Sequence, residues 1–410
     1  MSKVTLSYPH PPARPDQAPD FSRIDRSAPG ALDVPPLDIT AQDCWPYAVG
    51  LVRVLDDDGQ AAGPWADYLG DLTADRLKQG LRDMLRMRAV DQRMQNAQRQ
   101  GKTSFYLQCT GEEAIGCGFQ RQLGEGDMNF PTYRQQSLLI AADYPLESLL
   151  GQLYSNDLDP LQGRQLPIMH SARDYGFFSI SGNLGTQYVQ AVGWAMACAL
   201  RGNDKIAAGW IGDGATASND FHSALLSASV YQPPVVLNVV NNQWAISTYT
   251  GVAAGRSQTY AARALGYGIP AIRVDGNDYL AVLAVSKWAI ERARAGHGPV
   301  IIEWFTYRAA AHSTSDDPSA YRAKDEAAAW PFGDPVERLK AHMILRGDWT
   351  EDRHEQTWAE LLAEVAEVQK RVEAHGTFVN PKPVSPAAIF TGVYADMPEH
   401  LRRQRQEMGY

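Results

Sequence analysis

The sequence contains few cysteines, no excess of basic residues and no apolar run long enough to cross a membrane. Four cysteines are scattered over 410 residues without the close spacing of metal ligands, which favours buried thiols in a reducing compartment over a disulfide framework. A formal net charge of −9 gives no electrostatic reason to expect a nucleic-acid partner. The N-terminal region lacks the apolar core of a signal peptide, and the longest apolar stretch, residues 189–200, is too short to span a bilayer. We therefore expect a cytoplasmic protein that binds neither membrane nor nucleic acid.

The length of the chain allows one large α/β domain with appended pieces. Residues 1–70 are proline-rich or irregular, and alternating apolar residues around the Asp-Asp-Asp-Gly run at 56–59 predict a hairpin within this arm. We interpret the arm as packing against a neighbouring subunit and assign it no chemistry. The α/β domain is predicted to occupy residues 71–380, followed by a C-terminal tail with a last helix at 381–410.

Short apolar runs alternate with segments of helical periodicity, which predicts an α/β fold with a doubly wound, mainly parallel sheet. The predicted strands are residues 206–211, 235–240, 271–274 and 300–305, with a shorter strand and turn within 127–134. The predicted helices are residues 73–100, 186–200, 260–265 and 278–295, with two amphipathic helices at 334–346 and 350–375.

A Gly-Asp-Gly turn directly follows the predicted strand at 206–211. Gly212 and Gly214 lack side chains, so the backbone around Asp213 can approach a ligand closely at the end of the strand. The helix that begins near Ala215 adds free backbone N–H groups, which suit a phosphate. This turn is therefore a candidate site for a phosphorylated ligand.

An Asn-Asn pair, Asn241 and Asn242, ends the following strand and is expected at the same edge of the sheet as Asp213. Carboxylate and amide oxygens suit Mg²⁺, which takes one or two protein carboxylates and leaves positions for phosphates. A tight turn and an Asn-rich loop are each common at protein surfaces, but their placement around a strand, helix and strand favours a cofactor site. The arrangement resembles the thiamine-diphosphate fingerprint, in which GDG is followed by NN.

Several segments together are similar to one family, the alpha subunits of 2-oxo acid dehydrogenases. These are the thiamine-diphosphate-dependent decarboxylase components of large multienzyme complexes. The sequence of these segments is most similar to the branched-chain (2-oxoisovalerate) type. The resemblance runs from about Leu72 to Gln406 and leaves the arm outside it. The segments that carry it are SFYLQCTGEEA, NNQWAISTYT, RVDGNDYLAV, TYRAAAHSTSDDPSAYR and FTGVYADMPEHLRRQ.

The resemblance implies roles for individual residues. Asp213, Asn242 and the main-chain carbonyl of Trp244 would ligate Mg²⁺, and Tyr133 and Arg134 would reach the diphosphate. The full set of implied cofactor-binding residues is Tyr133, Arg134, Gly182, Leu184, Gly212, Asp213, Gly214, Ala215, Asn242, Trp244, Ala245, Ile246 and His312. Ser181, Thr186 and Gln187 match a monovalent-cation site found in some relatives.

Catalytic roles are implied for His312, Ser313 and Tyr133. A lone histidine in a polar loop is more often a solvated side chain, but the HSTSDD sequence around His312 favours hydrogen bonding to substrate or to developing charge. Ser313 falls where some relatives are phosphorylated. The apolar run at 104–107 is expected to form a wall near the cofactor that prefers branched substrates, although it is also compatible with simple packing of its loop.

Two features set this chain apart or leave it incomplete. Some relatives carry an arginine immediately before the Asn-Asn pair, where this chain has Val240, so the diphosphate charge is left to Mg²⁺, Arg134 and His312. The chemistry of thiamine needs an activating carboxylate, and Glu112, Glu113 and Glu303 are assigned to a helix start or a buried strand instead. In this family the carboxylate comes from a beta subunit. The resemblance therefore implies a heterotetramer with beta subunits, a lipoyl domain of an acyltransferase as a further partner, and a 2-oxo acid as substrate.

Three alternatives remain at the level of the sequence. A pyruvate-type dehydrogenase would share the fold and cofactor. A non-catalytic assembly subunit would be expected to lose ligands that are present here. A nucleotide-binding oxidoreductase would need a third glycine that the GDGATA turn lacks.

Overall fold

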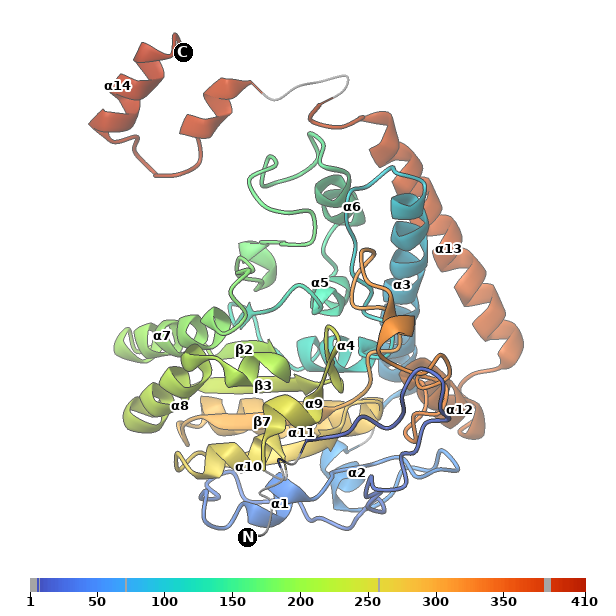
Figure 1. Ribbon diagram of the computed structural model, residues 1–410. Helices are drawn as coiled ribbons and strands as arrows, with labels where there is room; N and C mark the ends of the chain where they lie inside the picture. The colour runs from blue at the N-terminus through green and yellow to red at the C-terminus, as the bar shows by residue number, and fades with distance from the viewer. Residues whose placement is uncertain (1–5, 7, 71, 257–258, 380–384) are drawn as a thin grey trace.

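A five-stranded parallel sheet forms the centre of the protein in the computed structural model, which describes residues 6, 8–70, 72–256, 259–379 and 385–410 (Figure 1). The strand order is β1-β2-β3-β7-β6, and every neighbouring pair is parallel. A separate pair, β4 and β5, is antiparallel. The strand bounds are β1 Met128–Phe130, β2 Ala207–Gly212, β3 Val235–Asn241, β4 Trp244–Ala245, β5 Thr248–Tyr249, β6 Ala271–Asp275 and β7 Val300–Phe305.

The sheet is buried on both faces, which explains why its strands are mainly apolar and do not alternate regularly with polar residues, with buried exceptions such as Asn238 and Glu303. In β2, Ala208 and Trp210 belong to one hydrophobic cluster, whereas Ala207 and Ile211 belong to a second cluster on the opposite face. This two-sided burial confirms the doubly wound α/β fold predicted from the sequence.

Helices cover each face of the sheet. The first face carries α7 (Thr186–Leu200), α8 (Asn219–Tyr231) and α10 (Tyr260–Leu265), and the second carries α4 (Glu113–Gln120) and α11 (Tyr279–Arg294). The start of α11 is fixed by Asp278, whose side chain accepts hydrogen bonds from the N–H groups of Leu280 and Ala281, both at 3.1 Å.

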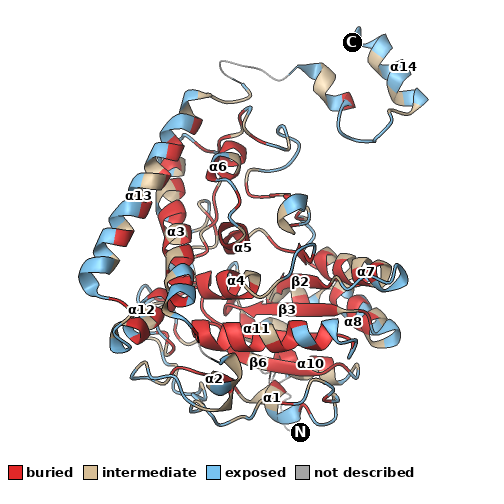
Figure 2. Cartoon of the chain, turned by 180° about the vertical axis from the view of Figure 1, so that it is seen from behind, coloured by how far each residue is buried: buried red, intermediate tan, exposed pale blue. Residues whose placement is uncertain are grey.

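A layer of long helices lies outside the second face. These are α3 (Ala74–Arg99), α12 (Pro335–Leu345) and α13 (Glu351–Ala374), and α13 runs alongside α3 (Figure 1). Arg93 Nε donates to Gln369 Oε1 at 2.7 Å across this pair. One side of α13 is buried and the other exposed, so it closes the core on this side (Figure 2). The sequence predicted all three helices.

The N-terminal arm packs on its own chain, and the interpretation that it also contacts a neighbouring subunit stays a prediction. Val52 pairs with Val274 of β6, and Leu55 bridges Ala61 around the predicted hairpin turn. Trp288 Nε1 of α11 donates to the carbonyl of Pro35 at 2.8 Å. The arm also contains two short helices absent from the prediction, α1 (Trp45–Val49) and α2 (Pro64–Leu69).

The C-terminal segment extends away from the body of the protein (Figure 1). Its 3-10 helix η4 (Pro386–Phe390) contacts the body through Arg164, whose Nη2 donates to the carbonyls of Ala388 at 2.6 Å and Thr391 at 2.7 Å. The proposed domain limits at residues 71 and 380–381, and the Lys-Pro stretch that begins the tail, lie outside the described residues. The remaining elements are α5 Gln136–Ala141, α6 Leu146–Tyr154, η1 Arg173–Tyr175, η2 Gly214–Ala217, α9 Thr250–Ala254, η3 Pro318–Ala320 and α14 Glu399–Glu407.

All four cysteines are buried and unpaired, as predicted. Within the described part of the chain, no helix combines the length and the apolar character needed to cross a membrane.

Candidate functional site

A cavity of about 460 Å³ opens at the carboxyl ends of β2 and β3, the edge where ligands bind in parallel α/β sheets. Twelve of the residues that the sequence assigned to the cofactor reach it, although they come from distant parts of the chain. These are Tyr133, Arg134, Leu184, Gly212, Asp213, Gly214, Ala215, Asn242, Trp244, Ala245, Ile246 and His312.

Asp213 is the carboxylate at the end of β2. Its Oδ1 accepts a hydrogen bond from Gly214 N at 2.8 Å, while its buried Oδ2 has no hydrogen-bond partner. Burial raises the pKa of Asp213 to about 6. A Cβ added to Gly212 would meet nothing within 4 Å, whereas one added to Gly214 would lie 2.5 Å from Ala245 Cβ. Gly212 therefore borders open space near Asp213, whereas the absent side chain of Gly214 allows the close approach of Ala245.

Asn242 faces Asp213 across the same cavity from the end of β3. Its Nδ2 donates to Glu112 Oε1 at 2.7 Å, and its Oδ1 accepts from Trp244 N at 3.3 Å. The carbonyl of Trp244 accepts from Arg308 Nη1 at 2.9 Å and keeps a second lone pair. The neighbouring Asn241 points elsewhere, because its Nδ2 donates to Glu303 Oε1 at 2.8 Å.

The turn after Asn242 has an unusual backbone. Gln243 and Ile246 both have positive φ angles, 75° and 54°, a region that β-branched side chains rarely adopt. Arg308 holds the turn through a second bond, from Nη2 to the carbonyl of Ile246 at 3.0 Å. Arg308 is almost fully buried, and burial, followed by the nearby Arg134, lowers its pKa to about 10.

Arg134 is the buried cation of the cavity, with 5% of its surface exposed. Its Nη1 donates to the carbonyl of Gln108 at 2.6 Å, and its Nη2 donates to the carbonyl of His312 at 2.9 Å. Tyr133 lies edge-on to the His312 ring, with the ring centroids 5.9 Å apart. Tyr133, Arg134 and His312 therefore form one packed group, as the sequence predicted for residues that share a site.

His312 is held in its neutral form. Burial and the positive charges of Arg134 and Arg308 lower its pKa to about 3. Its Nδ1 lies 3.2 Å from Arg134 Nη2, and because a guanidinium only donates, Nδ1 must accept and the proton sits on Nε2. The backbone N–H of His312 donates to Asp316 Oδ2 at 2.7 Å, which fixes the loop. His312 can therefore donate one hydrogen bond from Nε2.

Two assigned residues do not line the cavity. Gly182 is exposed, although Leu184 two positions later does reach it. Ser313 is buried, and its Oγ accepts from Ser315 N at 3.2 Å. In the suggested cation site, Gln187 Nε2 donates to the Ser181 carbonyl at 3.0 Å, and Thr186 Oγ1 donates to Asp220 Oδ2 at 3.3 Å.

None of the residues at 104–107 lines the cavity of this chain, so the apolar wall stays a prediction without support from the cavity lining. Tyr106 and Leu107 are buried in the core, and Tyr106 donates through its hydroxyl to Asp91 Oδ1 at 2.8 Å. Thr314 N donates to the Tyr106 carbonyl at 3.0 Å, so the segment supports the His312 loop instead. These contacts favour the alternative that the segment packs its own loop.

Glu112 and Arg308 belong to the site but had no assigned role in the sequence. Glu112 lines the cavity with 4% of its surface exposed, and burial, opposed by Arg134, raises its pKa to about 7. The only sequence signal for Glu112 was a pair of acids at a helix start, which usually marks a cap. Arg308 lies four residues before His312 within the segment TYRAAAHSTSDDPSAYR, but it was given no role of its own.

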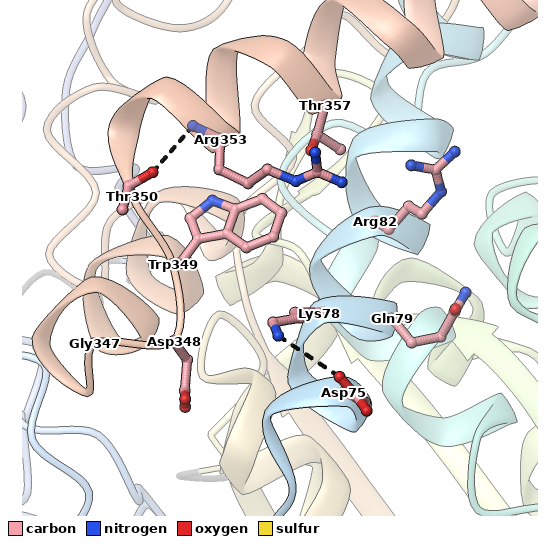
Figure 3. Close-up of a pocket in the computed structure, with 10 residues that line it drawn as sticks. All are labelled: Asp75, Lys78, Gln79, Arg82, Gly347, Asp348, Trp349, Thr350, Arg353 and Thr357. Carbon is pink, nitrogen blue, oxygen red and sulfur yellow. Dashed lines mark hydrogen bonds and ion pairs between the residues drawn. The ribbon is translucent and has the colours of Figure 1, made fainter.

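A second cavity, of about 570 Å³, lies between α3 and the start of α13 and has a different character (Figure 3). Lys78, Arg82 and Arg353 surround it, and Lys78 already pairs with Asp75 at 3.6 Å. It holds none of the residues assigned from the sequence and is not the candidate site.

Comparison with known proteins agrees with this geometry. The model of the dehydrogenase E1 component family matches residues 81–380. The chain is 55% identical to 2-oxoisovalerate dehydrogenase subunit alpha of Pseudomonas aeruginosa, over 99% of this chain and 98% of the relative. It is 37% identical to the mitochondrial 2-oxoisovalerate dehydrogenase subunit alpha of Bos taurus, over 88% of this chain and 77% of the relative. It is also 37% identical to the pyruvate dehydrogenase E1 component subunit alpha of Acholeplasma laidlawii, over 76% of this chain and 86% of the relative. The chain therefore belongs to the dehydrogenase E1 component family and is similar, within it, to the alpha subunits of 2-oxoisovalerate dehydrogenases.

Proposed function

We propose that this chain is the alpha subunit of a thiamine-diphosphate-dependent dehydrogenase that decarboxylates branched-chain 2-oxo acids such as 2-oxoisovalerate. The observation that carries the proposal is one cavity, lined by Asp213, Asn242 and His312, at the carboxyl edge of a parallel sheet. The family depends on thiamine diphosphate, and the relatives with the names given above support the branched-chain substrate. The cytoplasmic location stays a prediction.

The donor set fits Mg²⁺ with a diphosphate. Asp213 Oδ2 is a buried carboxylate oxygen without a partner, and such atoms normally bind a donor or a cation. Asn242 and the Trp244 carbonyl would add two neutral oxygens, which suits an ion that keeps positions for phosphate oxygens. Among the residues that the structure describes, no three His, Cys, Asp or Glu side chains gather as a metal cluster, so a cation here relies on such mixed ligands.

The diphosphate would be held by the backbone N–H of Ala215 and by the positive charge of Arg134, because the N–H of Gly214 already donates to Asp213 Oδ1 at 2.8 Å. Val240 lines the cavity where some relatives have an arginine, so no second cation comes from that position. Gly182 is the least supported of the assigned contacts, because it lies outside the cavity. Leu184 would contact the aminopyrimidine in its place.

Thiamine diphosphate, when bound, supplies the electron sink that allows a 2-oxo acid to lose CO₂. The chain itself provides His312, which is neutral near pH 7 and presents an Nε2–H donor toward the cavity. A donor fixed in a buried site stabilises developing negative charge without having to reorganise. Tyr133 supports the His312 ring edge-on and adds a hydroxyl to the same wall. A direct chemical role for Ser313 has less support, because its side chain lies outside the cavity.

The name "subunit alpha" of the relatives implies a beta partner within a multienzyme complex. We further propose an α2β2 heterotetramer that passes its acyl group to the lipoyl domain of an acyltransferase. The cavity offers two carboxylates, Asp213 and Glu112; the first would bind the metal, and the second is engaged by Asn242. The activating carboxylate is therefore expected from the beta subunit.

The deciding experiment measures kcat/KM for 2-oxoisovalerate and for pyruvate on the alpha–beta assembly. A hydrophobic pocket distinguishes one methylene by about 10–200-fold, so pyruvate should be a poor substrate that still reacts. A ratio at or below one would overturn the branched-chain assignment in favour of the pyruvate type. Failure to act on any 2-oxo acid with added thiamine diphosphate and Mg²⁺ would overturn the proposed function, as expected for a non-catalytic subunit.

A further inference from the structure

Glu112 is a buried carboxylate at the start of a helix that does not cap the helix. It is the N-cap residue of α4, yet its side chain makes no capping hydrogen bond to the helix. The next residue, Glu113, serves the structure instead: its Oε2 accepts from Gly111 N at 2.8 Å, and its Oε1 pairs with Arg88 Nη2 at 2.7 Å. Glu112 turns toward the cavity, and Glu113 does not line it.

The contacts of Glu112 converge on Asn242. Glu112 Oε1 accepts from Asn242 Nδ2 at 2.7 Å, the shortest hydrogen bond that the amide makes. Arg134 Nε lies 3.7 Å from the same oxygen, too far for a hydrogen bond but close enough for electrostatic attraction. Glu112 Oε2 is buried without any partner. The carboxylate is therefore secured mainly by one donor, the amide of a proposed metal ligand.

This bond decides which way the Asn242 amide faces. A carboxamide has a donor end and an acceptor end of nearly the same shape, and the surrounding partners determine its orientation. In this contact Glu112 Oε1 is the acceptor, so it selects the Nδ2 end of the amide and leaves Oδ1 on the other side. Partners of this kind orient metal ligands in many proteins, and their loss typically lowers metal affinity by about 10–100-fold.

We propose that Glu112 is a positioning residue that fixes the Asn242 amide with its oxygen available to the Mg²⁺ of the cofactor. The inference rests on the proposed function, because it assumes that Asn242 is a ligand. It adds a residue for which the comparisons and the sequence gave no role. Glu112 acts through Asn242 and need not touch the substrate or the cofactor.

The test measures metal affinity in the full alpha–beta assembly by electron paramagnetic resonance, with Mn²⁺ as the probe and thiamine diphosphate present. Glu112→Ala should weaken Mn²⁺ binding by about 10–100-fold. Glu112→Gln should recover most of the affinity, since its Oε1 can still accept from Asn242 Nδ2. Glu113→Gln is the matched control: it loses part of the Arg88 ion pair at the same helix start and should change thermal stability but leave Mn²⁺ affinity unchanged.

A double-mutant cycle separates positioning from general damage. If Glu112 acts through Asn242, Glu112→Ala should weaken Mn²⁺ binding much less in an Asn242→Ala background than in the wild type. Full additivity of the two changes would overturn the inference. If Glu112→Ala does not fold, Glu112→Asp takes its place in the test, because it keeps the charge but withdraws the carboxylate from Asn242. Wild-type Mn²⁺ affinity in Glu112→Asp would also overturn the inference. If the wild-type assembly binds no Mn²⁺ with thiamine diphosphate, both the proposed function and the inference are overturned. If the wild type and Glu112→Ala bind Mn²⁺ equally well, the inference alone is overturned.

Discussion

Replacing Asn242 with alanine should nearly abolish Mg²⁺-dependent binding of thiamine diphosphate while leaving the fold intact. Asn242 directly follows β3 with 7% of its surface exposed, and its side chain lines the cavity and belongs to none of the hydrophobic clusters. A hydrogen bond or ligand to a charged group contributes roughly 1.5–3 kcal/mol. Because each 1.4 kcal/mol changes an equilibrium constant tenfold, affinity should fall by roughly 10–150-fold or more.

The same substitution should also lower the free energy of unfolding. Removing Asn242 Nδ2 leaves Glu112 Oε1 with only Arg134, at 3.7 Å, as a partner. Leaving a buried acceptor unpaired costs about 1–3 kcal/mol, and more when it is charged. We therefore expect a folded but less stable variant, with a native circular dichroism spectrum and a lower midpoint of thermal unfolding.

Asn241→Ala provides a matched control. Asn241 is equally buried, at 6% exposure, and its Nδ2 donates to the carboxylate of Glu303 at 2.8 Å, but it does not line the cavity. Its loss should cost similar stability and leave cofactor affinity close to that of the wild type. Isothermal titration with thiamine diphosphate and Mg²⁺ on the alpha–beta assembly compares the two variants. Unchanged affinity in Asn242→Ala, or an equal loss in both variants, would refute the assignment of Asn242 as a ligand.

Three further predictions concern chemistry and pH. The chain purified without a beta subunit should show no 2-oxo acid decarboxylation, and clear turnover by rigorously purified alpha chain would contradict the expected external carboxylate. His312→Ala should lower the rate of reductive acylation of a lipoyl domain by about 10²–10⁴-fold with a much smaller effect on cofactor affinity, and near-normal rates would exclude a catalytic role. Burial lowers the pKa of His170 from 6.5 to about 4, so the unfolded chain takes up a proton first as the pH falls. His170 should therefore cost stability progressively between pH 6.5 and pH 4, by up to about 3 kcal/mol. Chemical unfolding across this range should show a smaller loss in His170→Gln, and an identical pH dependence would refute the shift.

The elements of the fold were predictable where local chemistry and burial agree. The strand expected at 300–305 matches β7 at both ends, because a strand buried on two faces is mainly apolar along its length, here with Glu303 as its one charged residue. Thr73 marked the start of α3, since its side chain accepts from Arg76 N. The helices of the arm, α1 and α2, were missed because five- and six-residue helices carry too little periodicity to detect.

The sequence predicted the proposed metal ligands of the site, but not the residues that hold those ligands in place. Asp213 and Asn242 follow strands directly, so the topology alone brings them to one edge. The direction of a side chain at a helix start depends on tertiary contacts, and the sequence gave no reason to distinguish Glu112, which faces the cavity, from Glu113, which pairs with Arg88. The same limit applies to the segment 104–107, because an apolar run predicts burial but not what the residues are buried against.

The positive φ of Ile246 has a consequence for how a ligand is received. A β-branched residue in that conformation costs of order 1–3 kcal/mol and persists only where its surroundings impose it. Arg308 imposes it by binding the carbonyls of Trp244 and Ile246 at 2.9 and 3.0 Å. The turn is thus ordered during folding and not during binding. The free energy of ligand binding is therefore not reduced by the entropic cost of ordering the turn.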